Sequence, residues 1–334
     1  MAEINFRSYP NATRVAIGAN VVCNANFSNA FNGMTNLVYY DIPANNIVDM
    51  SNMCNGCTSL TGNPVCGPNT TNMSYAYENC FNLTGNPVCG DNVVDMSYAY
   101  NSCGKLTGNP VCGSNVTNMV RAYANCTSIT GAPICGNNVV NMHGAYHNCI
   151  SFNTAPVCGP NVTDLSFAYY RCLNITGSPV CTDKVINFSM TYGNCYKISG
   201  NPVCGNNVTN MAFTYQNCQN LSGPPVCGPN VTNLHYAYWL CGNIRGNAYF
   251  YSNNVTNAAN CFYNRRNTIM MNIHVHSNSA TLTTLLYNNA KSSLFGNVTS
   301  WYYNSTANFY YNNTYNVRIY PVDNVYQTKI NHGI

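Results

Sequence analysis

The sequence has few charged side chains: Asp, Glu, Lys and Arg make up 7% of its 334 residues, against roughly 25% in an average soluble protein. The net charge of +4 is spread thinly, and no run of basic residues is longer than the pair Arg265 and Arg266. Binding to nucleic acid requires a stripe of basic residues that neutralises phosphates. The composition therefore argues against a nucleic-acid partner.

The sequence also lacks a long apolar run. No stretch of about 18 apolar residues occurs, so we expect no membrane insertion. The opening segment, MAEINFRSYP, contains no basic stretch followed by an apolar one, so we expect no secretory signal. The 20 cysteines point the other way, because secreted chains with many cysteines usually form disulfides.

Groups that suit catalysis are scarce as well. The chain has only nine carboxylates, and the closest Asp pair, Asp91 and Asp95, occupies repeat positions that in most other units hold Asn or Pro. No nucleophile elbow, phosphate-binding loop or zinc-protease motif occurs. We therefore expect a protein that is not an enzyme, with no catalytic residues and no cofactor.

Four columns of residues recur every 23 positions. The first cysteine column is Cys66, Cys89, Cys112, Cys135, Cys158, Cys181, Cys204 and Cys227. The second is Cys57, Cys80, Cys103, Cys126, Cys149, Cys172, Cys195, Cys218 and Cys241. The tyrosine column is Tyr77, Tyr100, Tyr123, Tyr146, Tyr169, Tyr192, Tyr215 and Tyr238. An apolar column runs from Phe27 to Leu234, so at least ten units share one register and stack on a continuous core.

Each unit divides into segments with different patterns. Residues 93–96 form a short β-type run, and residues 97–103, centred on Ala and Tyr, suit one short helical turn. Residues 106–111 are extended, with Leu106 and Val111 expected to point inward. Gly, Pro, Asn and Asp then turn the corner into the next unit.

A proline column, from Pro64 to Pro225, lies in the extended segment of successive units. Each proline removes a hydrogen-bond donor from a ladder, so we expect a short and irregular parallel sheet. Part of the hydrogen bonding is expected to pass to Asn side chains that can stack as amide ladders, at Asn69, Asn92, Asn115, Asn138, Asn161, Asn207 and Asn230.

This pattern resembles the BspA-like leucine-rich repeat of bacterial and protist surface proteins, over about residues 21–262. The matching residues of one unit are Val116, Thr117, Asn118, Met119, Ala122, Tyr123, Cys126 and Ile129. The chain departs from that repeat where Asn-Pro-Val replaces its Ile-x-Ile strand and where Cys replaces the following Pro. The resemblance implies a repeat solenoid, a leucine-rich-repeat-like right-handed coil with short irregular parallel strands and one short helical turn per repeat. It also implies non-enzymatic recognition, adhesion or assembly.

The ends of the chain lack the repeat, and a solenoid needs caps that stop end-to-end stacking. We predict an N-terminal cap over residues 1–20, the solenoid over 21–262, and degenerate coils with a C-terminal cap over 263–334. Within the last part, strands are expected at 272–276 and 316–321, with a helix at 281–295 between them.

The cysteine columns leave two interpretations open. Either the cysteines form a ladder of free, inward-facing thiols, or they form disulfides within or between units. Zinc is a weaker alternative, since Cys54-x-x-Cys57 has ligand spacing but no second close pair follows it. His274 and His276 share one strand face, where they either bind a metal around a trimer axis or simply face solvent. We predict no metal site.

Residues near the tyrosine column differ from unit to unit. We predict a recognition surface for a protein or carbohydrate partner, because aromatic and amide groups provide contact area and hydrogen bonds without charge. Its candidate residues are Glu78, His147, Tyr170, Gln216 and Trp239. The favoured hypothesis is a virion-surface protein of a bacteriophage (a fibre, decoration or receptor-binding module) that meets other virion or assembly subunits. The alternatives are an extracellular cell-surface adhesin and a self-assembling structural element, and a homo-oligomer is possible.

Overall fold

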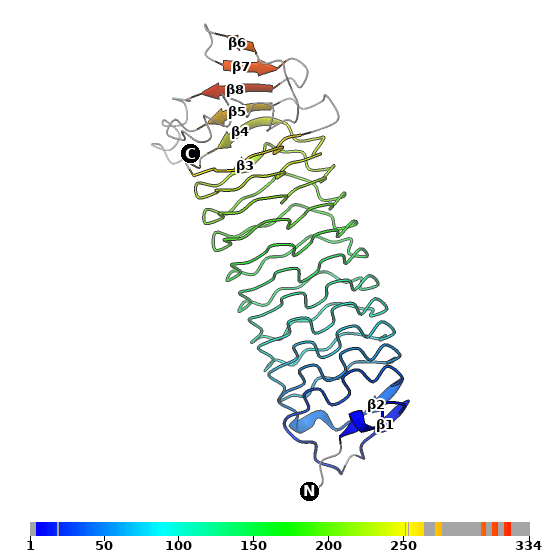
Figure 1. The fold of residues 1–334 in the computed structure, drawn as a ribbon. Helices are drawn as coiled ribbons and strands as arrows, with labels where there is room; N and C mark the ends of the chain where they lie inside the picture. The colour runs from blue at the N-terminus through cyan, green and yellow to red at the C-terminus, as the bar shows by residue number, and fades with distance from the viewer. Residues whose placement is uncertain are drawn as a thin grey trace. The chain divides into compact units, whose positions relative to one another are not determined.

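The computed structural model describes residues 5–18, 20–250, 252 and 254–263, and the backbone of four further strands up to residue 321. The chain divides into two compact units, residues 1–175 and residues 176–334. Each unit has a repeat fold in which successive 23-residue coils stack in register (Figure 1).

Among the described residues of the N-terminal unit, helices and strands lie near its start. They are η1 (Phe6–Ser8), β1 (Arg14–Ala16), β2 (Tyr39–Asp41) and η2 (Ala44–Asn46), and β1 pairs with β2 in parallel. The later coils are joined by single parallel bridges at one Asp/Asn column, the last of them between Asn141 and Asp164. One bridge per coil is the short, irregular sheet that the proline column indicates.

The C-terminal unit contains a six-stranded sheet with the strand order β3-β4-β5-β8-β7-β6. Its strands are β3 (Val226–Cys227), β4 (Gly246–Phe250), β5 (Met271–Val275), β6 (Tyr302–Asn304), β7 (Phe309–Asn312) and β8 (Val317–Pro321). The pairs from β3 to β8 are parallel, whereas β7 runs antiparallel to β8 and to β6.

The two strands expected near the C-terminus are present. β5 and β8 begin and end within one residue of the predicted segments 272–276 and 316–321. The helix predicted at 281–295 lies outside the described residues. The cap boundaries at residues 20 and 262 stay predictions. Among the described residues, no helix is both long enough and apolar enough to cross a membrane.

The core of each coil consists of a constant set of inward-facing columns. In the coil that begins near residue 92, the side chains of Val93, Met96, Tyr100, Cys103 and Leu106 are all 0% exposed. Within each unit the tyrosine rings lie nearly parallel, at 5.5–5.7 Å between centroids from Tyr77 to Tyr169 and 5.4–5.8 Å from Tyr192 to Tyr238. Stacked rings of this kind combine a large buried area with favourable π geometry.

The prediction that Val111 points inward is wrong. Pro110 is the buried residue of this pair, and Val111 is half-buried. The main chain of Val111 turns toward the core, where its N–H donates to the Tyr123 hydroxyl (3.0 Å) and its carbonyl accepts from that hydroxyl (2.7 Å). Because successive residues of an extended segment alternate in direction, an inward proline forces the valine side chain outward.

The prediction of a helical turn at residues 97–103 is also wrong, since this segment forms a chain of turns. The N–H of Ala99 bonds back to Met96 O, whereas the N–H of Tyr100 bonds to Ala122 O in the next coil. Tyr98 (φ 56°) and Ser102 (φ 66°) are left-handed. In a helix, successive N–H groups bond to carbonyls four residues earlier in the same segment, but here alternate N–H groups bond to carbonyls of the next coil.

The hydrogen bonds that the prolines remove are replaced mainly by tyrosine. In successive coils the buried hydroxyl both accepts from and donates to the backbone of the residue after the proline, as Tyr100 does with Val88 at 3.0 and 2.6 Å. As predicted, the Asn column also carries hydrogen bonds from coil to coil, but to main chain rather than to other amides: Asn92 Nδ2 donates to Pro68 O of the preceding coil (2.9 Å). A buried main-chain carbonyl without a hydrogen-bond donor is costly, so the Asn side chains donate to carbonyls rather than to one another.

Candidate functional site

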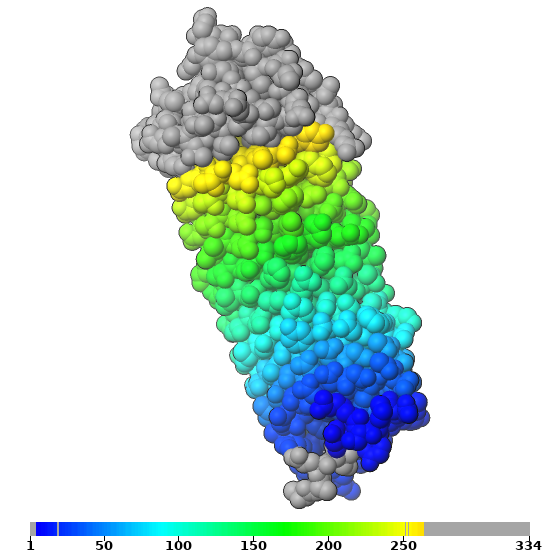
Figure 2. Space-filling model, viewed as in Figure 1, coloured from blue at the N-terminus to red at the C-terminus, as the bar shows by residue number. Residues whose placement is uncertain are grey.

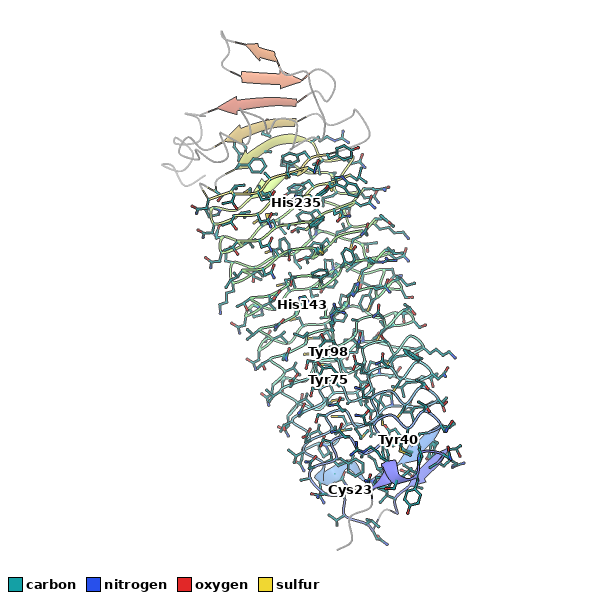
Figure 3. The ribbon with its side chains drawn as sticks, in the orientation of Figure 1. Cys23, Tyr40, Tyr75, Tyr98, His143 and His235 are labelled. Atoms are coloured by element: carbon teal, nitrogen blue, oxygen red, sulfur yellow. The ribbon has the colours of Figure 1, made fainter. Side chains whose placement is uncertain are left out.

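The chain of turns carries the residues that differ most between coils. Two columns of half-buried side chains lie here, one two residues after the apolar column and one immediately after the buried tyrosine. We call these columns, with the residues between and beside them, the variable face. Figure 3 shows three of its members, Tyr75, Tyr98 and His143, along one side of the N-terminal unit.

Left-handed backbone at regular positions creates this face. In each coil two residues of the turn segment have positive φ, for example Tyr75 (58°) and Asn79 (60°). Such a conformation costs roughly 1–2 kcal/mol for a residue other than Gly, and the hydrogen bonds between coils offset it. The column of Asn79 holds Gly at Gly33 and Gly56, and this Gly/Asn preference is the sequence signal from which the turns could have been found.

All five candidate residues of the predicted recognition surface lie at one repeat position. Each follows the core column of the tyrosines and is half-buried: Glu78, His147, Tyr170, Gln216 and Trp239. The Glu78 carboxylate accepts hydrogen bonds from Asn55 Nδ2 (3.2 Å) and Asn101 Nδ2 (2.9 Å), so it links three coils.

The sequence pattern missed the second column of the variable face. It contains Tyr75 and Tyr98, whose rings stack at 4.6 Å and 7°, and later Phe167. The ring of Phe167 meets that of Tyr170 edge to face at 5.8 Å. Aromatic rings therefore form two groups on this face of the N-terminal unit, Tyr75 with Tyr98, and Phe167 with Tyr170 and the neighbouring histidine rings. In the space-filling view the coils of this unit pack tightly against one another (Figure 2).

A basic and aromatic cluster occupies part of this surface in the N-terminal unit. His143 and His147 come from one coil, with Arg121 on the coil before them and Tyr170 and Arg171 on the coil after. The rings of His147 and Tyr170 lie 5.5 Å apart. Desolvation first, and then the charges of Arg121 and Arg171, lower the pKa of His147 to about 4. At neutral pH the two guanidiniums therefore carry the positive charge and this imidazole is neutral.

His143 belongs to a chain of hydrogen bonds. Its Nδ1 lies 2.7 Å from Ser166 Oγ, which donates to Asp164 Oδ1 at 2.5 Å, and the N–H of Ser166 binds the same carboxylate oxygen. Burial lowers the pKa of His143, against the opposing effect of Asp164. Because the serine is 1% exposed and lies between the other two groups, the three do not form a nucleophilic triad, in which histidine must stand in the middle.

The C-terminal unit carries its own aromatic cluster on the variable face. The rings of Phe213 and Tyr236 stack at 5.0 Å and 6°, and His235 meets Tyr236 edge to face at 4.3 Å. Trp239 lies 5.8 Å from Tyr236 and 6.3 Å from Tyr263. Figure 3 marks the position of His235.

Unsatisfied polar atoms gather on the same face. Five buried side-chain atoms lack a hydrogen-bond partner among the described residues, and three of them are Asn101 Oδ1, His147 Nδ1 and His235 Nδ1. Each such atom costs on the order of 1–3 kcal/mol. A surface under selection for stability alone would pair these atoms, which favours a functional role for the variable face.

All 20 cysteines are free thiols. In the fully buried column the thiol donates to a carbonyl of an earlier coil, as Cys103 Sγ does to Tyr77 O at 3.0 Å. In the half-buried column the sulfur accepts an N–H from the next coil, as Cys89 does from Gly113 at 3.3 Å. Burial raises the pKa of both types, to about 12 for Cys89 and Cys126.

These pKa values predict slow thiol chemistry, because the thiolate is the reactive form. At pH 8, a disulfide exchange reagent should label at most a few thiols of the native protein within minutes. In guanidinium chloride the same reagent should label all 20. Mass spectrometry of the labelled protein counts the adducts. Rapid labelling of the whole half-buried column in the native state would contradict the burial described here.

The described residues include the two cysteines considered above as zinc ligands, Cys54 and Cys57. No group of three or more His, Cys, Asp or Glu side chains in this described part of the chain could hold a metal ion. Cys54 and Cys57 are fully buried, and Cys57 Sγ donates to Phe31 O at 3.0 Å. The backbone of His274 lies in β5, and His276 lies outside the described residues.

The closest Asp pair binds local backbone. Asp95 Oδ1 accepts the N–H of Ser97 at 2.8 Å, and Asp91 Oδ1 accepts the N–H of Ser114 in the next coil at 3.4 Å. These are the turn and ladder positions expected from the repeat.

Comparison with known proteins does not assign the chain to a family. No protein-family model matches the chain, and no curated protein matches it with significance. A leucine-rich cell surface protein from Faecalibacterium prausnitzii A2-165 is similar in structure, with 12% sequence identity and a TM-score of 0.40. The match covers 87% of this chain and 92% of that one. Membership of the BspA-like family stays a prediction, and the description of the repeat depends on the chain's own columns.

Proposed function

We propose that the chain is a non-enzymatic, leucine-rich-repeat-like solenoid with right-handed coils, and that its variable face recognises a protein or carbohydrate surface outside the cell. The single observation that carries the proposal is the contrast between columns. The tyrosine and cysteine core columns repeat the same residue in coil after coil, whereas the position immediately after the buried tyrosine changes at each step, from Glu78 to Trp239.

The chemistry of the changing positions supports recognition. In the C-terminal unit they hold Phe213, Tyr236 and Trp239, and the ring of Tyr236 contacts both of the others. Tyrosine and tryptophan supply contact area at a small entropy cost and often dominate binding energy.

Whether the chain belongs to a cell surface or to a virion is tested by determining where the protein is found. We propose a cell-surface adhesin, for which protease treatment of intact cells should release peptides of this chain. A virion-surface protein, the hypothesis favoured by the sequence, requires its peptides in purified particles, which mass spectrometry detects. Peptides released only by cell lysis, and absent from particles, would exclude both carriers.

The role of the variable face is tested with a matched pair of aromatic variants. Trp239→Ala removes a ring of the proposed surface, and Tyr196→Ala removes a ring that is 39% exposed elsewhere on the same unit. Beads coated with the full chain are scored for adhesion to a panel of cells and immobilised glycans. We expect Trp239→Ala to reduce adhesion at least tenfold, as for a central interface residue, and Tyr196→Ala to change it less than twofold. Equal losses, or no adhesion above albumin-coated beads, would refute the proposal.

A further inference from the structure

The variable face of the N-terminal unit carries two arginines, and both border the same pair of histidines. Arg121 and Arg171 each act electrostatically on His147. The aliphatic stem of Arg121 lies over Gly144 in the next coil, where its Cγ would be 3.1 Å from a Cβ at that position. Gly144 is the smallest residue of its column, and its lack of a side chain gives the arginine room to reach His143.

The carboxylate beside this cluster, that of Asp164, already accepts hydrogen bonds from a neighbouring residue. Asp164 is the carboxylate that acts on His143, and it accepts two hydrogen bonds from Ser166. Neither guanidinium forms an ion pair in the part of the chain that the structure describes. Two arginines therefore stand with unused donors on a face that is otherwise nearly uncharged, and an arginine fork matches carboxylate or sulfate groups.

The two arginines are two coils apart, which corresponds to about 10 Å if neighbouring coils are spaced like strands. Between them lie the rings of His143, His147, Phe167 and Tyr170, all of which are half-buried. The cluster thus presents cation, imidazole, aromatic ring and cation in succession along the stack.

We infer that Arg121, His143, His147, Phe167, Tyr170 and Arg171 bind an acidic polysaccharide. The two guanidiniums pair with its carboxylate or sulfate groups, and the imidazoles and aromatic rings contact its sugar rings. The inference rests on the proposed recognition function and names the partner class of one part of the variable face.

An acidic peptide fits this surface less well. Peptides commonly bind a repeat or sheet by adding a strand to unpaired main-chain groups. Here the N–H of Arg121 bonds to His143 O, and the N–H groups of Gly144 and His147 bond to Ser166 O and to Gly144 O. With the backbone occupied, recognition depends on side chains, as it does for a polymer of sugars.

The test measures the dissociation constant (Kd) of the full chain for four polymers by calorimetry. Polygalacturonate supplies carboxylates, dextran sulfate supplies sulfates, dextran is the neutral polysaccharide, and polyglutamate is the acidic peptide. Arg121→Gln and Arg171→Gln remove the proposed contacts. Lys105→Gln, in the same unit, removes one charge from a side chain that binds Asn82 Oδ1 (2.7 Å) away from the cluster.

We expect polygalacturonate or dextran sulfate to bind, with Kd raised about tenfold or more by either arginine variant, since each loses a charge-assisted hydrogen bond. Lys105→Gln should change Kd less than twofold. Which of the two polymers binds more tightly identifies the acidic group. The inference is overturned if Lys105→Gln weakens binding as much, if dextran or polyglutamate binds as tightly, or if no polymer binds. A loss of bead adhesion with Trp239→Ala alone would then leave the recognition function standing, because that residue lies in the other unit.

Discussion

Replacing Tyr123 with alanine should lower the free energy of unfolding by about 5 kcal/mol. The side chain is 0% exposed and stacks between Tyr100 and Tyr146 at 5.5 and 5.7 Å. Truncation of a large buried aromatic residue costs about 3–5 kcal/mol. The variant also leaves the N–H and carbonyl of Val111 without their shared hydroxyl partner, which adds a desolvation cost. Urea titration followed by circular dichroism measures the change.

Tyr123→Phe separates the two contributions. It keeps the stacked ring and removes only the hydroxyl, so we expect a loss of about 1–3 kcal/mol. A phenylalanine variant as unstable as the alanine variant would show that the hydroxyl bridge, rather than the ring, holds the coils together. A phenylalanine variant as stable as the native chain would mean that the backbone of Val111 finds another partner.

The second large effect is expected for Gly113→Ala. A Cβ at this position would lie 2.2 Å from the main-chain O of Gly90 in the preceding coil, so relief requires the backbones of two coils to separate. We expect a loss of about 3 kcal/mol or more, at the upper end of overpacking costs, and a clearly lower Tm in thermal unfolding.

The matched control is Gly136→Ala, one coil later in the same column. Its Cβ would meet Cys112 Sγ at 3.2 Å and the O of Gly113 at 3.5 Å, so a small movement of one thiol suffices. We expect a loss below about 1 kcal/mol. Equal Tm values for the two variants would contradict the close approach of coils at Gly113.

Much of the repeat could be predicted from residue spacing. A side chain that recurs every 23 residues has to occupy the same place in every coil, so Met96, Tyr100, Cys103 and Leu106 were identifiable as core residues before any coordinates. The strand β5 and the strand β8 were recognisable from their apolar alternation, because that alternation is a property of the local chain.

The conformation of the segment 97–103 could not be read in the same way. Its Ala and Tyr residues favour a helix when considered alone, yet the N–H groups of Tyr98, Tyr100 and Ser102 bond to the following coil. Those acceptors exist only when the next coil is in place. Local propensity is a weak preference that tertiary contacts override.

Part of the candidate site could likewise be predicted from the sequence, and part of it could not. Sequence variation pointed to His147 and Tyr170, but it did not show that Arg121 lies near His147, because these residues come from different coils. That neighbourhood depends on the left-handed turns and on the stacking of the coils.

The sequence by itself determined the register, the inward columns and the near absence of charge, since these follow from which residue stands where along the chain. Only the tertiary structure decided that tyrosine hydroxyls replace the hydrogen bonds lost at proline, and that two arginines and two histidines share one surface. The physical reason is that these interactions join residues 12 to 50 positions apart, whose distances are set by the packing of one coil on the next.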